Sequence, residues 1–396
     1  MAASPQPRVE PRSLPTAASD PPAAPLIHSS RRLPELDGLR GIAVAVVVVY
    51  HLAFSDVPVP KFFSGLVGAG RLGWSGVDLF FVLSGFLIGG ILLDSRHSAN
   101  YFKTFYLRRA YRILPIYFVL LGLFSLRFLH VGAGALGEFA GSVIPWYAYF
   151  TFTHNIWMAV LGTLGAGVVG PTWSLAVEEQ FYLSAPFVVR RLRPATLAKA
   201  LLGVVIAAPV LRTALYLFSA RNAVADYVSM PCRADALSLG ILAAWLVRTP
   251  RGWKFLLDRG GALKGAAGVF FVGMVVMTHW GYFLSGPMVT FGYTWLALFY
   301  VSVLLIAVSG ASESLGRVLR ARVLMQLGAV SYFVYLFHLP LMEAARRILW
   351  LRFPRESATV YFAGGCLGIV LTLLAAQLSW RFFEKPLVGR SHRYRY

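Results

Sequence analysis

Charged residues are scarce in this sequence. Asp, Glu, Lys and Arg together make up 14% of the 396 residues, whereas about a quarter of a soluble domain is charged. Apolar runs of roughly 17–25 residues, the length that crosses a bilayer, recur along most of the chain. The shortage of charge therefore excludes an ordinary soluble domain and predicts an all-α, polytopic bundle of transmembrane helices.

Cysteine is nearly absent, since the chain holds only Cys232 and Cys366. Cys232 falls in a predicted loop and Cys366 inside an apolar run, so no disulfide bridge is expected between them. Neither residue has the spacing of a metal site. We predict no bound metal and no bound cofactor.

Acidic residues are outnumbered by basic ones, 17 to 37, which gives a formal net charge of +20. Such a charge is typical of nucleic-acid-binding proteins. Here, however, Lys and Arg gather in the short segments between apolar runs. A multi-pass membrane protein needs cationic cytoplasmic loops to fix its orientation. We therefore expect the lipid bilayer, and no nucleic acid, to be the partner of these charges.

Both ends of the chain lack apolar runs. Residues 1–30 are rich in Pro, Ala and Ser, which predicts a disordered cytoplasmic tail and no signal peptide. Residues 389–396 predict a short basic cytoplasmic tail. Residues 33–388 are expected to form one membrane domain, with no soluble domain before, within or after it.

Hydropathy predicts ten spans. Both termini are expected in the cytoplasm, because roughly three quarters of the 37 Lys and Arg then lie on the cytoplasmic side. Residues 140–157 are apolar but are interrupted by Pro145 and His154. We interpret them as a re-entrant or interfacial segment; if they span, the count becomes eleven. The expected spans are 36–55, 77–94, 113–130, 172–189, 200–219, 236–248, 266–283, 289–309, 325–342 and 359–380.

One predicted outer loop departs from this charge bias, because it carries Arg346, Arg347, Arg352 and Arg355. Either these are exposed side chains whose guanidiniums reach the membrane interface, or they bind an anionic acceptor.

A histidine lies deep within the first predicted span. His51 follows Arg40 by 11 residues, three helical turns, so the two share a helix face about 16 Å apart along the axis. With Arg40 at the cytoplasmic interface, His51 lies near mid-membrane. It is either a buried histidine bonded to a neighbouring helix or a functional group that lines a cavity.

Two adjacent acids, Glu178 and Glu179, interrupt the fourth predicted span. Adjacent positions point about 100° apart, so at most one of them faces a given cavity. Glu178 shares a face with Ser174 and Tyr182, and Trp173 lies close by in sequence. The pattern predicts a site lined by these residues, and the alternative is a structural salt bridge from Glu178.

Other charged residues lie at span ends. Arg109 and Arg112, at i and i+3, form a fork suited to phosphates, or else they anchor the cytoplasmic side. Asp78 is either an interfacial cap or the partner that orients a buried base. Arg233 and Asp235 are expected to form interhelical ion pairs.

Eight motifs follow one another along the chain: "LDGLRGIAV", "YHL", "GVDLFFVLSGFLI", "FYLRRAYRILP", "PTWSLAVEEQFYL", "RADALSLG", "YFVYLFHLPL" and "RFFEKPL". Taken in order, these motifs resemble the type 3 family of integral-membrane acyltransferases. The resemblance covers roughly residues 33–388 and implies O-acylation of sugars, cell-surface glycans, lipopolysaccharide or antibiotics by a multi-pass enzyme of the bacterial plasma membrane.

The resemblance also implies where the donor binds. Cytosolic acyl-coenzyme A, with acetyl as the expected acyl group, would place its phosphates on Arg109 and Arg112, with Arg40 assisting. The acceptor would be a hydroxyl of a sugar or glycan. Some family members carry an added esterase-like domain; since this chain ends at Tyr396, any second transfer step is expected to need a separate protein.

The base implied by the resemblance is His51, which would deprotonate the acceptor hydroxyl while Glu178 or Asp78 orients its ring. A route through an acyl group carried on His51 fits the sequence equally well. The rival function is a polytopic transporter or flippase of a lipid-linked or glycan substrate, although no inverted repeat is visible.

Overall fold

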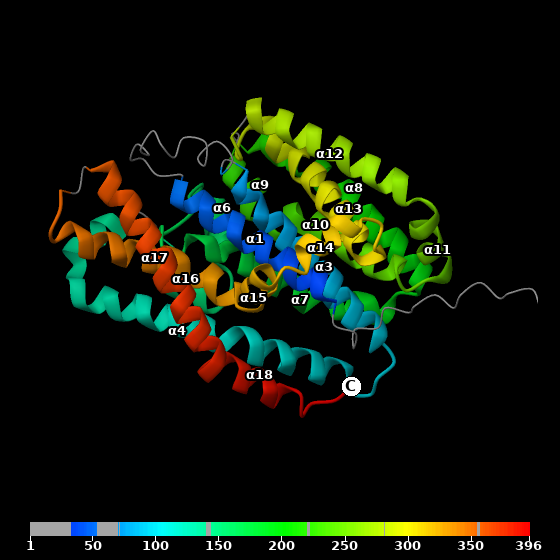
Figure 1. Ribbon diagram of the computed structural model, residues 1–396, viewed down its shortest axis with the longest axis horizontal. Helices are drawn as coiled ribbons and strands as arrows, with labels where there is room; N and C mark the ends of the chain where they lie inside the picture. Colours follow the sequence, from blue (N-terminus) through cyan, green and yellow to red (C-terminus); the bar gives the residue numbers. More distant parts are fainter. Residues whose placement is uncertain are drawn as a thin grey trace, which may run out of the picture.

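The structure is a computed structural model that describes residues 33–53, 70, 72–139, 144–219, 222–280, 282–354 and 357–396, without the side chains of 127–139 and 278–280. All regular structure in these ranges is helical, which confirms the predicted all-α class (Figure 1). The tail predicted for residues 1–30 lies outside the described residues. The elements are α1 (Pro34–Ala53), η2 (Gly73–Ser75), α3 (Gly76–Asp94), α4 (Tyr101–Phe139), α5 (Trp146–Phe150), α6 (His154–Leu161), η3 (Gly170–Thr172), α7 (Trp173–Arg191), α8 (Pro194–Phe218), α9 (Ala223–Val228), α10 (Met230–Leu246), α11 (Pro250–Asp258), α12 (Gly260–Trp280), η4 (Met288–Gly292), α13 (Tyr293–Ser309), α14 (Glu313–Leu319), α15 (Arg322–Ala329), α16 (Ser331–Trp350), α17 (Ala358–Ser379), η5 (Trp380–Glu384) and α18 (Lys385–Ser391).

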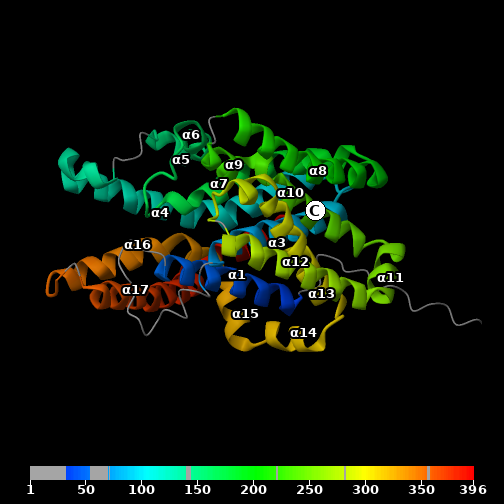
Figure 2. The ribbon, with the colours of Figure 1, turned by 90° about the horizontal axis from the view of Figure 1, so that it is seen from above.

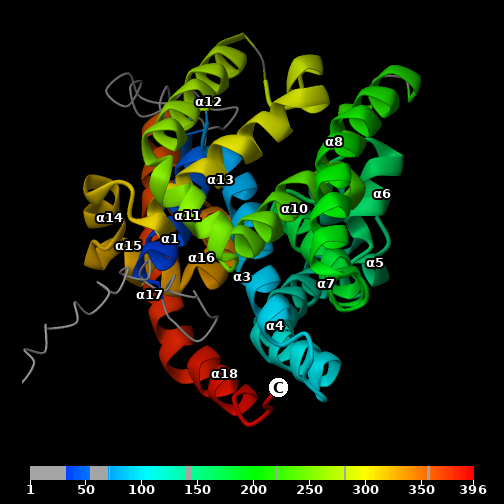
Figure 3. The ribbon, with the colours of Figure 1, turned by 90° about the vertical axis from the view of Figure 1, so that its right-hand side faces the viewer.

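Helices α1 and α3 lie at the centre of the bundle. Figure 2 shows α3 beside a layer that contains α7, α8 and α10, with α1 on the other side of α3 and with α14 and α15 beyond α1, and Figure 3 shows the same order from the side. Their faces are accordingly buried along most of their length. Side chains that project from α1 and α3 therefore meet those of α7 and α16 inside the bundle.

The contact between α3 and α10 depends on glycine. A Cβ added at Gly85 would fall 2.1 Å from the carbonyl oxygen of Leu237, and one added at Gly240 would fall 2.3 Å from that of Val82. No side chain fits at either position, so the two backbones pack directly against each other. These glycines of α3 and α10 thus serve helix packing.

Many described helices are suited to a membrane. Seven are long and apolar enough to cross one, or up to nine if two bent pairs, α10 with α11 at 98° and α15 with α16 at 77°, each count as one span. The outward face of α8 is apolar and exposed, with Leu202 at 52%, Ile206 at 61% and Val210 at 65%. The predicted fourth span, α7, is not among the candidates within the described residues, so the count of ten and the orientation of the termini stay predictions.

The segment around residues 140–157 does not cross the bundle as one helix. Its described part folds into α5 and α6, of 5 and 8 residues, which are separated by a turn at Phe152 with a positive φ of 54°. At 1.5 Å per residue, neither helix approaches the roughly 30 Å of a bilayer core. The structure therefore supports the re-entrant or interfacial interpretation of this segment.

Two buried ion pairs join α10 to its neighbours. Arg233 donates to Asp78 of α3, and Arg212 of α8 donates to Asp235 at 3.0 Å. The expectation of interhelical ion pairs at Arg233 and Asp235 is confirmed. Asp78 is accordingly committed to the packing of α3 on α10.

The basic carboxyl-terminal segment predicted for residues 389–396 packs on the start of α4. Arg108 donates to the carbonyl oxygen of Tyr394 at 2.6 and 3.0 Å, and Thr104 donates to that of Arg395 at 2.9 Å. Arg108 is thereby separated in role from Arg109 and Arg112, its neighbours on the helix.

Candidate active site

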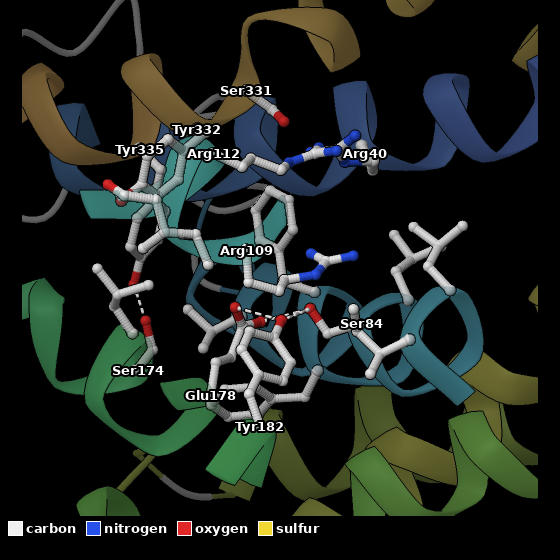
Figure 4. A pocket seen from close by; sticks show the side chains of 18 of the residues that line it. Arg40, Ser84, Arg109, Arg112, Ser174, Glu178, Tyr182, Ser331, Tyr332 and Tyr335 are labelled. Carbon is white, nitrogen blue, oxygen red and sulfur yellow. Dashed lines mark hydrogen bonds between the residues drawn. The ribbon is translucent and has the colours of Figure 1, made fainter. Parts of the chain in front are cut away.

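Two adjoining cavities lie within the described part of the bundle. The first, here the arginine cavity, has a volume of about 190 Å³; its polar lining residues are Arg40, Ser84, Arg109, Arg112, Ser174, Glu178, Tyr182, Ser331, Tyr332 and Tyr335 (Figure 4). The second, here the histidine cavity, measures about 560 Å³; its lining includes Tyr50, His51, Trp173, Tyr335, Glu343, Arg346, Arg347 and Tyr361. Tyr335 and Val77 line both, so the cavities share a wall.

Three guanidiniums project into the arginine cavity. Arg40 comes from α1, while Arg109 and Arg112 lie one turn apart on α4 and so reach the same side. Among the described residues, no carboxylate is close enough to form a salt bridge with any of the three. A cavity with three unneutralised guanidiniums is suited to a polyanionic ligand.

A carboxylate lies across the cavity from these arginines. Glu178 accepts hydrogen bonds from the hydroxyl of Ser84 at 2.6 Å and from that of Tyr182 at 3.1 Å, and Arg109 lies 5.5 Å over the Tyr182 ring. Figure 4 shows this cluster on one side of the cavity, Arg40 and Arg112 on the other, and Arg109 between them next to Tyr182. The hydrogen bonds fix the carboxylate in place, so the cavity has a defined charge pattern.

The spacing argument about the two glutamates agrees with this geometry. Ser174, Glu178 and Tyr182 line the arginine cavity together, whereas Glu179 does not line it. One carboxylate oxygen of Glu179 is buried without a partner among the described residues. What either glutamate does in a reaction stays a prediction.

His51 forms a pair with a second histidine, His338 of α16. Nε2 of His338 lies 3.2 Å from Nδ1 of His51, and His338 is 1% exposed. Sequence analysis did not single out His338, although it also stands in an apolar run, which is the signal that identified His51. Within the described residues, this is the hydrogen-bond contact that the structure gives His51 outside its own helix.

The proton positions on this pair follow from its carbonyl partners. Nδ1 of His338 faces the carbonyl oxygens of Val334 and Tyr335, at 3.0 and 2.8 Å, so it carries the hydrogen and leaves Nε2 as an acceptor. Nδ1 of His51 faces the carbonyl oxygen of Val47 at 2.9 Å and is likewise the donor. The lone pair of His51 is therefore on Nε2.

The wall between the cavities is held by hydroxyl groups. The Tyr335 hydroxyl donates to the carbonyl oxygen of Pro171 at 2.8 Å and lies 2.6 Å from the hydroxyl of Ser174. Trp173, the next residue toward the amino end of α7, lines the histidine cavity instead. Residues predicted as one site are thus divided between two adjoining cavities.

Two expected contacts are corrected. Neither Glu178 nor Asp78 has a hydrogen bond to His51 among those the structure gives: Glu178 is bonded to Ser84 and Tyr182, and Asp78 is bonded to Arg233. His338 holds that position instead. Nothing in the sequence identified His338 as this partner, because α16 follows α1 by almost three hundred residues.

Comparison with known proteins finds bacterial relatives along most of the chain. The peptidoglycan O-acetyltransferase OatA of Listeria monocytogenes is 28% identical over 376 residues, which is 91% of this chain and 56% of that protein. The putative peptidoglycan O-acetyltransferase YrhL of Bacillus subtilis is 28% identical over 384 residues, 92% of this chain and 56% of that protein. The O-acetyltransferase OatA of Staphylococcus aureus is 26% identical over 383 residues, 91% of this chain and 58% of that protein.

The chain therefore spans little more than half the length of the curated relatives it matches. No solved structure matches it significantly. Its apolar helices and its bacterial relatives make it a multi-pass protein of the bacterial plasma membrane. A family model described as "Acyltransferase domain" matches residues 33–381, nearly all of the described bundle. The chain accordingly belongs to the type 3 family of membrane acyltransferases.

Proposed function

We propose that this chain transfers an acetyl group from cytosolic acetyl-coenzyme A to a hydroxyl of a cell-surface glycan. The observation that carries the proposal is the arginine cavity, whose three guanidiniums lack carboxylate partners among the described residues and which shares a wall with the cavity of His51. The names of the relatives, which describe peptidoglycan or unspecified O-acetylation, support the acetyl group and the glycan.

The donor would bind from the Arg40 end of α1, which we place in the cytoplasm. Arg109, Arg112 and Arg40 would bind its phosphates, since guanidiniums offer paired donors that match phosphate oxygens. Glu178 lies opposite and would fix Tyr182 and Ser84 along the path of the donor arm. The thioester would then pass Tyr335, whose side chain must turn aside for the two cavities to connect.

The chemistry would take place at Nε2 of His51. This atom would take the proton from the acceptor hydroxyl as its oxygen bonds to the thioester carbonyl carbon. The carbon–sulfur bond would then break, and the coenzyme A thiolate would receive the proton from His51. His338 and the Val47 carbonyl accept from Nδ1 of His51 and would stabilise the charged ring in between.

The same lone pair fits a two-step route. Nε2 of His51 would first bond to the acetyl carbonyl carbon as the carbon–sulfur bond breaks and the coenzyme A thiolate leaves. The acceptor oxygen would then bond to that carbon as the carbon–nitrogen bond breaks, and the acceptor proton would pass to the thiolate. Both routes use the same residues. They differ in whether the protein itself carries label before an acceptor is added.

The experiment is a transfer assay with the purified chain in lipid nanodiscs. Acetyl-coenzyme A labelled in the acetyl group is added with a soluble cell-wall oligosaccharide, and free thiol and labelled glycan are measured. Thiol release matched by label in the glycan supports the proposal. Absence of thiol release, together with movement of a glycan across a vesicle membrane, would establish the transporter alternative. Acid-quenched protein that carries label without acceptor indicates the two-step route.

A further inference from the structure

Arg346 is a buried cation that forms no salt bridge within the described residues, although Glu343, one turn before it on α16, stabilises its charge electrostatically. It lies on α16 in the lining of the histidine cavity and is 5% exposed. Its Nε donates to the carbonyl oxygen of Tyr361 at 3.4 Å, and its guanidinium lies 3.7 Å over the Tyr361 ring. Its Nη2 is buried without a hydrogen-bond partner. An unsatisfied buried guanidinium is costly, so it needs an explanation.

The other buried arginines show what a structural role looks like in this protein. Among the described residues, Arg212 and Arg233 are also more than nine-tenths buried, and each is paired with an aspartate. Arg347, next to Arg346, pairs with Glu343 at 2.6 Å. Arg346 has no such partner in the described ranges. Its charge is therefore available to a ligand in the cavity.

The structure builds a niche for this side chain. A Cβ at Gly364 would fall 2.8 Å from Cγ of Arg346, and one at Gly365 would fall 3.2 Å from its Nη2. Glycine on α17 thus leaves room for the arginine against the helix. Because Arg346 follows His338 by eight residues on α16, the two lie about 12 Å apart along the helix axis. A single acceptor molecule is long enough to lie along both positions.

We propose that the histidine cavity takes an acceptor with an anionic group, a sugar carboxylate or a sugar phosphate, and that Arg346 binds this anion while a hydroxyl of the same molecule lies at Nε2 of His51. This inference rests on the proposed transfer reaction and specifies its acceptor. A guanidinium binds either anion through two parallel hydrogen bonds, which also fixes the orientation of the acceptor. It accounts for a charge that the packing of the bundle leaves uncompensated.

The test is equilibrium binding to the chain in nanodiscs, without donor. Three fluorescently labelled tetrasaccharides are compared: N-acetylmuramic acid oligosaccharide with free carboxylates, the same molecule as its methyl amides, and a chitin tetrasaccharide with a terminal phosphate. We expect at least one anionic form to bind roughly ten times more tightly than the neutral amide. The form that does so identifies the anion as carboxylate or phosphate.

Substitutions then assign the preference to the residue. Arg346→Gln should abolish it while leaving binding of the neutral amide within twofold, and Arg346→Lys should retain part of it. Arg352→Gln, at an exposed arginine that does not line the cavity, is the matched control and should keep the preference. Equal binding of all three probes to the unaltered chain, no measurable binding of any, or a preference that survives Arg346→Gln would overturn the inference.

The readout separates this inference from the transfer reaction. A preference for the anion without any thiol release from acetyl-coenzyme A leaves the anion site standing and refutes the transferase proposal. Thiol release and glycan labelling without an anion preference support the transferase proposal and refute the anion site. Size-exclusion profiles of each variant show whether the protein that was tested is folded.

Discussion

The arginine cavity and the histidine cavity share a wall but differ in charge and size. The first encloses about 190 Å³ and gathers three guanidiniums around one carboxylate. The second encloses about 560 Å³ and combines a histidine pair with one unneutralised guanidinium, Arg346. The smaller cavity is suited to a compact, strongly anionic group, and the larger one to a bulkier molecule with a single anion. The difference is what a transferase needs if donor and acceptor arrive from opposite sides of a membrane.

The two cavities should also affect different kinetic parameters. Substitutions in the arginine cavity should act on the donor, and substitutions beside His51 should act on turnover. If both sets change the same parameter, the division into a donor and an acceptor cavity is wrong.

His51→Ala should lower turnover by about 10²- to 10⁴-fold, because it removes the lone pair that takes the acceptor proton. The melting temperature in nanodiscs should change little, since His51 is only half-buried. Turnover is measured as label transferred to glycan at saturating donor. A variant that keeps more than a tenth of the original rate would show that the base is another residue.

Arg109→Ala and Arg112→Ala should each raise the KM for acetyl-coenzyme A by roughly ten- to a hundredfold and leave the acceptor KM unchanged. Lysine at either position should recover the donor KM only in part, because a point charge does not copy the paired donors of a guanidinium. Arg108→Ala, whose side chain bonds the Tyr394 carbonyl instead, is the matched control. Equal changes in the KM for the donor and in the KM for the acceptor would contradict the assignment of the arginine cavity to the donor.

Glu178→Gln should reduce kcat/KM for the donor about tenfold, because two hydroxyl groups donate to this carboxylate in the arginine cavity. Glu179→Gln should cost less activity, since its side chain does not line that cavity. Measuring kcat/KM and melting temperature for both variants ranks them. The reverse ranking would move the acidic role to Glu179.

His338→Phe should lower kcat by roughly three- to tenfold and leave the donor KM unchanged, because it removes one acceptor of the Nδ1 proton of His51. His338→Gln should recover part of the loss, since its amide oxygen can accept the same hydrogen. A purely structural histidine would show no such recovery, and its loss would lower the melting temperature together with kcat.

Much of this architecture could be predicted from local patterns. Helical spacing alone predicts the all-α class, the shared face of Ser174, Glu178 and Tyr182, and the fork of Arg109 and Arg112. The partner of His51 could not, because α16 is brought to α1 by tertiary packing. A second histidine in an apolar run was visible at His338, but spacing alone does not pair it with any particular helix.

The role suggested for Asp78 shows the same limit. An acid near a span end fits a cap, an orienting group or an ion pair equally well, and only the packing of α3 on α10 selects Arg233 as its partner. Likewise, spacing placed Arg40 and His51 on a shared face of α1. The wall at Tyr335, which divides that face between two cavities, comes from α16.

The most direct test of the two-cavity account is to locate the bound donor. A coenzyme A analogue with a photoreactive acyl group is irradiated with the chain in nanodiscs, and the labelled peptides are identified by mass spectrometry with and without excess acetyl-coenzyme A. The account predicts competed label on the shared wall and its surroundings, at Val77, Tyr335 or His51. Competed label confined to the outward faces of α8 or α12, or label that excess donor does not reduce, would contradict it.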